Sequence, residues 1–98
     1  MQMNIEKTIE NNKAILAPEG WLDAQSSEEF SEVIESLGDD ITEMVIDLAK
    51  LEYISSAGMR LIVTAHKKMN GNLTICNVSD ELMEIFVMTG FDRRLNFV

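Results

Sequence analysis

The chain has 98 residues, the length of one compact domain, and its apolar fraction of 46% and charged fraction of 26% are typical of a folded globular protein. Its formal net charge of -9 makes nucleic acids and anionic membrane surfaces poor partners, because both are themselves negatively charged. A partner with a basic patch is a better electrostatic match. We therefore expect a single domain over residues 1–98 that binds neither nucleic acid nor membrane.

The compartment is indicated by cysteine usage and by the N-terminal segment. Cys76 is the one cysteine, so the fold does not depend on an internal disulfide or on an oxidising compartment. Its apolar neighbours favour a small buried side chain over a reactive thiol. Residues 1–10 lack the apolar core of a signal peptide, and no run approaches the ~18 apolar residues of a membrane span. These features predict a cytoplasmic protein.

The first predicted elements are two strands. Residues Met3–Thr8 alternate loosely between apolar and polar side chains, and Ala14–Ala17 is a short apolar run that begins after the turn-forming pair Asn11-Asn12. Together they predict a hairpin. Pro18 to Gly20 breaks the pattern, and because Pro18 has no backbone donor it suits a sheet edge or a bulge.

A first helix is predicted directly after this break. Ser26 and Glu29 have the spacing of a capping box, and Gly38 is placed to end the helix. Apolar side chains between them repeat at helical spacing: Phe30, Val33, Ile34 and Leu37. One face of this helix must therefore be buried.

The middle of the chain predicts a buried strand followed by a second helix. Met44–Leu48 is a short, nearly continuous apolar run, which suits a strand covered on both faces. Leu51–Ile54 leads to Ser55-Ser56, where the helix begins, and Asn70-Gly71 closes it. The residues expected on its buried face are Ala57, Leu61, Ile62, Ala65 and Met69.

The last third predicts another strand, a third helix and a short apolar tail. Leu73–Val78 reads as a buried strand, Ser79 as the cap of a helix that ends at Gly90, and Leu95–Val98 as a last strand or a packed terminus. Strands that alternate with helices imply parallel pairs joined by right-handed crossovers. The fold class is therefore α/β, with a mixed sheet of four to five strands and helices packed on it.

The most informative segment is residues 45–60, which reads VIDLAKLEYISSAGMR. A serine at the strand-to-helix turn is explained by helix capping alone, since its oxygen accepts a bond from an otherwise unpaired amide. The segment also resembles the signature of the STAS domain of bacterial anti-sigma factor antagonists, in an Ile-Ser-Ser-Ala-Gly-Leu-Arg variant. Residues 19–23 and 88–91 are similar to two further segments of that family.

The resemblance implies a STAS-like fold and a regulatory role. The family's phosphorylated serine falls on Ser56, and its preceding aspartate falls on Ser55. The implied partner is an anti-sigma factor that is also a serine kinase, bound by the unmodified form and released by the phosphorylated form. The implied contact residues are Asp23, Ser55, Ser56, Met59 and Arg60, with a core role for Met59 and a merely solvated side chain for Arg60 left open.

Two other readings stay open from the sequence. One is an interaction or scaffold domain that shares the fold but not the phosphorylation switch. The other is a catalytic or ligand-binding domain, for which the chain offers no phosphate loop, no metal-ligand cluster and no base beside Ser56. We expect no enzyme activity, no cofactor and no metal. Trp21 is expected to pack beside the sheet, with a role as an interface anchor left open, and His66 to lie on the surface.

Overall fold

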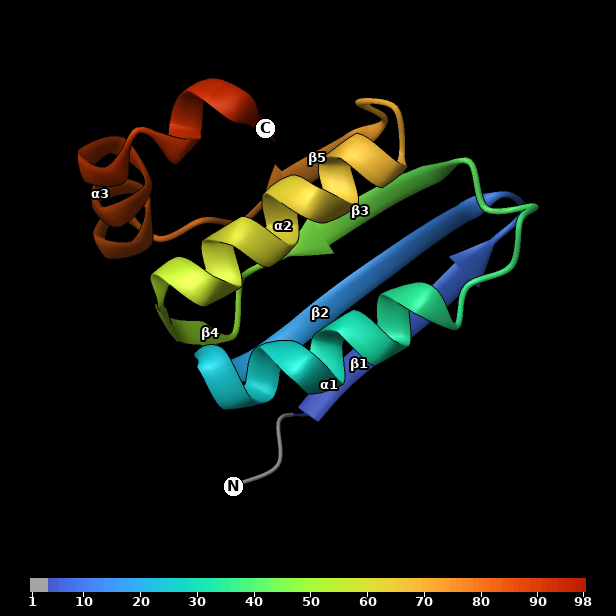
Figure 1. Cartoon of the computed structure of the whole chain (residues 1–98), viewed down its shortest axis with the longest axis horizontal. Coiled ribbons are helices and arrows are strands. Elements are labelled where there is room, and N and C mark those ends of the chain that lie inside the picture. The colour runs from blue at the N-terminus through green and yellow to red at the C-terminus, as the bar shows by residue number, and fades with distance from the viewer. Residues whose placement is uncertain (1–3) are drawn as a thin grey trace.

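The computed structural model describes residues 4–98, so Met3, predicted to begin the first strand, lies outside the described residues. A hairpin is followed by helices that alternate with strands (Figure 1). The elements are β1 (Asn4–Glu10), β2 (Lys13–Leu22), α1 (Ala24–Glu35), β3 (Glu43–Asp47), β4 (Leu51–Ile54), α2 (Ser56–Lys68), β5 (Leu73–Cys76), α3 (Asp80–Thr89), a 3₁₀ helix (Phe91–Arg94) and β6 (Asn96–Phe97).

The strands form a six-stranded mixed sheet in the order β1-β2-β3-β5-β6, with β4 paired to the end of β2. β1 is antiparallel to β2, and the remaining pairs are parallel. The predicted mixed α/β sheet is confirmed. Its strand number is higher than the four to five expected, because the four residues of β4 and the two of β6 also pair.

β2 is longer than predicted, because it continues through Pro18 to Leu22. The parallel partner of β2 changes along the strand. β3 pairs with β2 as far as Leu16, and β4 pairs with β2 from Gly20 onward. The register of the second pairing shifts between Gly20 and Trp21. Pro18 lies in the interval between these partners, where no parallel neighbour requires the N–H that proline lacks. The change of partner brings the end of β2 alongside the segment that leads into α2.

The helices α1 and α2 lie side by side over one face of the sheet (Figure 1). The hydrophobic core fills the space between these two helices and the sheet. Met44 and Ile46 of β3 point into it, whereas Val45 and Asp47 on the other face are only half-buried. The prediction that this strand is covered on both faces is therefore wrong. The largest fully buried side chains are Leu16, Leu22, Phe30, Met44, Ile46, Leu48, Ile54, Met59, Ile62, Leu73, Ile75 and Phe86.

α1 begins earlier than the sequence predicts. Its N-cap is Asp23, whose carboxylate accepts hydrogen bonds from the amides of Gln25 and Ser26. Ser26, predicted as the cap, lies at the third helical position, and its hydroxyl accepts a bond from the amide of Asp23 at 2.9 Å. The two residues form a capping box, in which the side chain of each accepts a hydrogen bond from the backbone amide of the other.

The C-terminal end of α1 also differs from the prediction, because Ser36 is the C-cap and Gly38 lies two residues beyond it. The ends of α3 follow local chemistry closely. Ser79 caps α3 by accepting a bond from the Leu82 amide, and Gly90 ends this helix with a φ of 80°, as predicted. The buried face of α2 differs from the prediction, since Ala57 and Leu61 are only half-buried. The buried residues within α2 are Gly58, Met59, Ile62, Val63 and Ala65.

Candidate functional site

Ser55 is the N-cap of α2, and all of its polar groups have structural roles. Its hydroxyl oxygen accepts a hydrogen bond from the amide of Gly58 at 3.3 Å. Its amide donates to the carbonyl oxygen of Leu22 at 2.9 Å, and its carbonyl accepts from the amide of Met59. The side chain is half-buried. Ser55 therefore fixes the start of the helix and the attachment of this start to β2.

Ser56, the next residue, is the first residue of α2 and is exposed. Within residues 4–98, its hydroxyl makes no hydrogen bond to another side chain or to a backbone group outside the helix. The free amides at the start of a helix and the positive end of the helix dipole lie beside it. The structure thus separates the two serines, because one holds the turn together and the other presents a free hydroxyl to solvent.

Gly58 allows the helix to approach the sheet closely at this turn. A Cβ atom added to Gly58 would lie 2.7 Å from the carbonyl oxygen of Leu22, 2.9 Å from the Leu22 side chain and 3.0 Å from that of Ile54. Real side chains do not make contacts this short, and two of the three neighbours are packed in the core. A glycine is therefore required here by space.

Asp23 lies directly after Leu22, so the caps of α1 and α2 meet at the end of β2. The hydrogen bonds from Ser26 and Gln25 hold the pKa of the Asp23 carboxyl below its ordinary value of 3.8. Asp23 is half-buried, and its carboxylate already accepts a hydrogen bond from the Ser26 amide in the first turn of α1. The structure brings Asp23, Ser55 and Ser56 into one region at the end of β2.

Met59 and Arg60, the other two predicted contact residues, point in different directions. Met59 is 2% exposed and belongs to the core, where its sulfur lies 3.5 Å from the hydroxyl oxygen of Thr89 in α3. A partner cannot reach its side chain without unpacking the core, so the prediction that Met59 forms part of the contact surface is wrong. Arg60 is exposed. Met59 and Arg60 point in different directions because successive side chains on an α-helix are rotated by about 100° around its axis.

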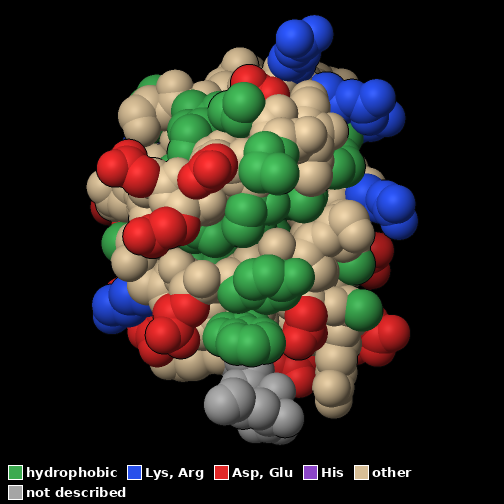
Figure 2. Space-filling view, turned by 90° about the vertical axis from the view of Figure 1, so that its left-hand side faces the viewer, with side chains coloured by type: hydrophobic (Ala, Val, Ile, Leu, Met, Phe, Trp, Pro, Cys, Tyr) green, Lys and Arg blue, Asp and Glu red, His purple; other side chains and the backbone are tan. Residues whose placement is uncertain are grey.

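An apolar surface lies at the same end of the molecule. Figure 2 shows hydrophobic side chains in a band that runs across this end, where β4, α3 and the start of α2 are found in Figure 1. Trp21 is 61% exposed and Tyr53 is 41% exposed, and their ring centroids are 5.2 Å apart. In α3, Met88 is 78% exposed. Exposed aromatic side chains of this size are typical of protein-binding surfaces.

The prediction that Trp21 packs beside the sheet is wrong, and Tyr53 was not among the predicted surface residues. Trp21 packs on Tyr53, its register partner across β2 and β4, but most of its ring faces solvent. The sequence does contain a signal for this exposure. Each aromatic residue directly precedes a strand residue that points inward, Leu22 after Trp21 and Ile54 after Tyr53. Because side chains alternate along a strand, both aromatic rings must point away from the core.

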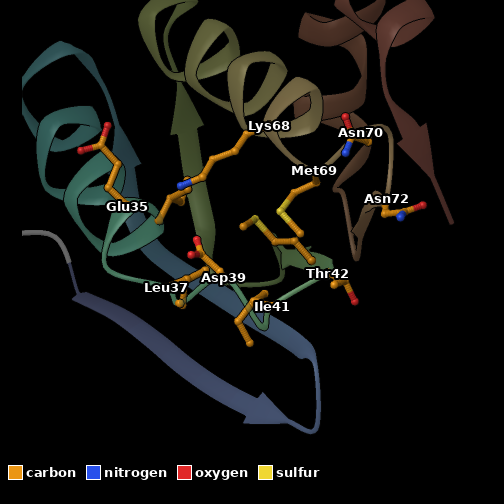
Figure 3. Close-up of a pocket in the computed structure, with 12 residues that line it drawn as sticks. Glu35, Leu37, Asp39, Ile41, Thr42, Lys68, Met69, Asn70 and Asn72 are labelled. Atoms are coloured by element: carbon orange, nitrogen blue, oxygen red, sulfur yellow. The ribbon is translucent and has the colours of Figure 1, made fainter.

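A groove lies at the other end of α1 and α2 (Figure 3). It has a volume of about 500 Å³, with Met44 and Met69 among its lining residues and the charged ends of Glu35 and Lys68 beside it. Lys68 is twelve residues after Ser56 on the same helix, which corresponds to about 18 Å. The groove is therefore separate from the site around Ser56.

No group of three or more His, Cys, Asp or Glu residues suited to a metal ion occurs within residues 4–98. His66 is half-buried, and its Nε2 atom lies 3.3 Å from the side-chain Nδ2 atom of Asn96, far along α2 from Ser56. Burial, and secondarily the charge of Asp47, raise the pKa of the Cys76 thiol. In the same part of the chain, no helix has both the length and the apolar character needed to cross a membrane.

The family model for the STAS domain matches residues 4–98. The chain belongs to the STAS domain family. Its sequence is 32% identical over 94 residues to the anti-sigma-B factor antagonist of Staphylococcus aureus, an alignment that covers 92% of this chain and 87% of that protein. A second relative, from Bordetella bronchiseptica, is 37% identical over 51 residues, which spans 49% of this chain and less than half, 44%, of the relative.

Solved structures of STAS proteins share the fold. An anti-sigma factor antagonist from Mycobacterium paratuberculosis superposes with a TM-score of 0.84 at 15% identity, over 97% of this chain and 84% of that chain. The phosphorylated form of the Bacillus cell fate determinant SpoIIAA superposes with a TM-score of 0.72 at 16% identity, over 98% of this chain and 90% of that one. At these identities the likeness establishes the architecture.

Proposed function

We propose that this STAS domain is an anti-sigma factor antagonist whose binding to an anti-sigma factor serine kinase is switched off by phosphorylation of Ser56. The observation that carries the proposal is the exposed and unbonded hydroxyl of Ser56, at the same end of the molecule as an exposed apolar band. A similar antagonist in Staphylococcus aureus supports the role. The unmodified chain binds the anti-sigma factor and thereby frees the sigma factor.

The contact surface of this proposal has a polar centre and an apolar border. Ser56, Ser55 and Asp23 form the centre, and Arg60 adds the one positive charge nearby on α2. Trp21 and Tyr53, with Met88 of α3, supply the apolar part, where most of the binding free energy of a protein interface is concentrated. The net charge of -9 favours a basic patch on the partner and speeds its association.

The switch needs no rearrangement of the fold. The kinase transfers the γ-phosphoryl group of ATP to the Ser56 oxygen, ADP leaves, and the hydroxyl proton is released. The phosphate adds about -1.5 to -2 charges and three acceptor oxygens at the start of α2. The helix tolerates an anion at this position, but a partner packed over the hydroxyl has to bury that charge. The complex therefore dissociates while the domain remains folded.

The decisive experiment compares two substitutions at Ser56 in binding to a candidate anti-sigma factor kinase from the same genome, by isothermal titration calorimetry. Ser56→Ala removes the hydroxyl and should retain affinity within about threefold, whereas Ser56→Glu adds a charge and should weaken binding at least about a hundredfold. Thr64→Glu, at an exposed position further along α2, is the matched control for an added charge. Equal affinities for Ser56→Glu and Ser56→Ala would reject the switch.

A second candidate is a STAS interaction domain that binds constitutively. It is favoured by Ser55, which stands where the family pattern has an aspartate beside the phosphorylated serine. Incubation with the kinase and ATP, followed by mass spectrometry of the intact protein and of the peptide containing Ser56, separates the two. A gain of one phosphate on Ser56 supports the switch, and an unmodified protein in a tight complex supports the constitutive domain.

Both candidates describe a binding protein in the cytoplasm, where transcription is regulated, and neither requires a cofactor. Catalysis is not part of the proposal, because within the described residues no base makes a hydrogen bond with the Ser56 hydroxyl, and His66 is on the third turn of the same helix and faces Asn96. A hydrolase built on Ser56 would require such a base within hydrogen-bond distance of the hydroxyl.

A further inference from the structure

Arg60 lies four residues after Ser56 on α2, so the two side chains share one face of the helix. Both are exposed, while Gly58 and Met59 between them face the core. Side chains on a helix tilt toward its N-terminus, so the long arginine side chain extends back toward the turn that contains Ser56. Residues with this spacing have Cβ atoms about 5–6 Å apart, within reach of a guanidinium and a phosphate.

Among the residues that the structure describes, Arg60 has no acidic partner in the unmodified protein. Within residues 4–98, the ion pair that occurs joins Lys50 to Glu19, and the first turn of α2 contains no acidic residue. A positive charge close to the positive end of a helix dipole is electrostatically unfavourable. Ser55 is neutral, so the cap adds no carboxylate to offset this charge or to repel an anion on its neighbour.

A phosphate on Ser56 changes this balance. Its oxygens can accept two parallel hydrogen bonds from the guanidinium of Arg60, the geometry in which arginine binds phosphate most strongly. The order of the two charges is also favourable. Ion pairs at positions i and i+4 of a helix are stronger when the acidic group is N-terminal to the basic one. Arg60 would then be withdrawn from any partner that it contacts in the unmodified state.

We infer that Arg60 binds the phosphate of phosphorylated Ser56 within the same chain, which makes the phosphorylated form more stable and longer-lived. The inference rests on the proposed phosphorylation of Ser56 for its biological use. Arg60 thereby takes part in both states of the switch. It contributes charge to the partner surface when Ser56 is free, and it holds the phosphate when Ser56 is modified.

The test uses phosphoserine incorporated at position 56 during translation, so that it does not depend on a kinase. Urea unfolding is measured for the wild-type chain and for Arg60→Gln, each with serine and with phosphoserine. Phosphorylation should raise the folding equilibrium constant about fivefold more in the wild type than in Arg60→Gln. Lys67→Gln, which removes an exposed charge from the last turn of α2, should behave as the wild type.

Two further measurements separate phosphate binding from a general effect on the helix. Phosphorus NMR titration should give a lower second pKa for the phosphate in the wild type than in Arg60→Gln, because the cation favours the dianion. A broad-specificity phosphatase should also remove the phosphate more slowly from the wild type, with Arg60→Lys between the two. Identical unfolding, pKa and dephosphorylation in wild type and Arg60→Gln would overturn the inference.

The outcomes for this inference and for the proposed function are independent. If the kinase leaves Ser56 unmodified, the proposed switch fails, yet the encoded phosphoserine still reports whether Arg60 binds a phosphate. If Arg60→Gln changes none of the three readouts, the intramolecular contact is absent, while Ser56→Glu can still abolish partner binding.

Discussion

The amide of Ser55 donates a hydrogen bond to the carbonyl oxygen of Leu22 over 2.9 Å, which joins the last residue of β2 to the N-cap of α2. The same oxygen lies 2.7 Å from the place that a Cβ atom on Gly58 would take. One backbone carbonyl therefore determines how closely the helix approaches the sheet. Because Ser55 is held from this side, Ser56 is directed to solvent.

Gly58→Ala should destabilise the domain strongly. The added methyl group meets the Leu22 carbonyl and two packed side chains, so the start of α2 has to move away from β2. We expect a loss of about 2–3 kcal/mol in the free energy of unfolding, measured with urea. Gly38→Ala is the matched control, because its Cβ meets the movable Asp40 side chain, and it should change stability by less than about 0.5 kcal/mol.

The two neighbouring serines should differ in their effect on stability. Ser55→Ala removes the hydroxyl that accepts the Gly58 amide and should cost about 1 kcal/mol, whereas Ser56→Ala removes an exposed hydroxyl and should be nearly neutral. Ser55→Asp should keep the cap, since aspartate is an equally good N-cap residue. Equal unfolding midpoints for the two alanine variants would contradict the division of roles between Ser55 and Ser56.

Asp23 should contribute to stability in a pH-dependent way. Hydrogen bonds from Ser26 and Gln25 lower its pKa in the folded state from the ordinary 3.8. The contribution of the carboxylate is therefore complete above this value and is lost as the pH falls through the lower folded-state pKa. The difference in thermal midpoint between wild type and Asp23→Asn should be constant from about pH 5 to 7 and shrink below about pH 4.

A control variant shows whether this behaviour belongs to the cap. Asp39→Asn removes an exposed carboxylate from the loop after α1, outside the N-cap of any helix. Its thermal midpoint should follow that of the wild type through the same pH range, apart from small effects of net charge. A difference for Asp23→Asn that stays constant down to about pH 2 would show that the capping bonds do not depend on ionisation.

The exposed aromatic pair offers a direct assay for the contact surface. Trp21 is the one tryptophan of the chain and is 61% exposed, so its fluorescence reports on this surface alone. Binding of the proposed partner should shift its emission to shorter wavelength, because the ring loses contact with water. Tyr53→Ala should weaken binding at least about tenfold with a small effect on stability.

Ile9→Ala is the matched control for this substitution. Ile9 is also exposed, at 47%, but it lies beside the hairpin turn, at the far end of β1 and β2 from Trp21. Its replacement should leave partner affinity unchanged. Unchanged Trp21 emission in a saturated complex would place the partner on another face of the domain.

Much of the fold was predictable because it depends on local chemistry. Ser79, with acidic residues after it and Gly90 at its end, specifies α3 through contacts within a few residues. The Asn11-Asn12 turn lies between two apolar runs and specifies the first hairpin, and Asn11 adopts the positive φ of 55° that such a turn uses. The serine turn at the start of α2 was predicted on the same basis.

The errors concern residues whose position depends on distant contacts. Pro18 was read as a break, yet β2 continues because its neighbour changes from β3 to β4 at that point. Ser26 was predicted as the cap of α1, whereas Asp23 caps this helix. Trp21 was expected to pack beside the sheet, but the core lies on the other side of β2.

The sequence by itself determined the N-caps of α2 and α3, the turns and the alternation of strands and helices, because each depends on side chains that bond to the backbone a few residues away. Only the tertiary structure decided that Ser55 is held while Ser56 is free, that Met59 points inward and that Trp21 points outward. These outcomes depend on which face of each element meets the sheet. That face is chosen by packing between segments that are far apart in the chain, such as Leu22 and Gly58.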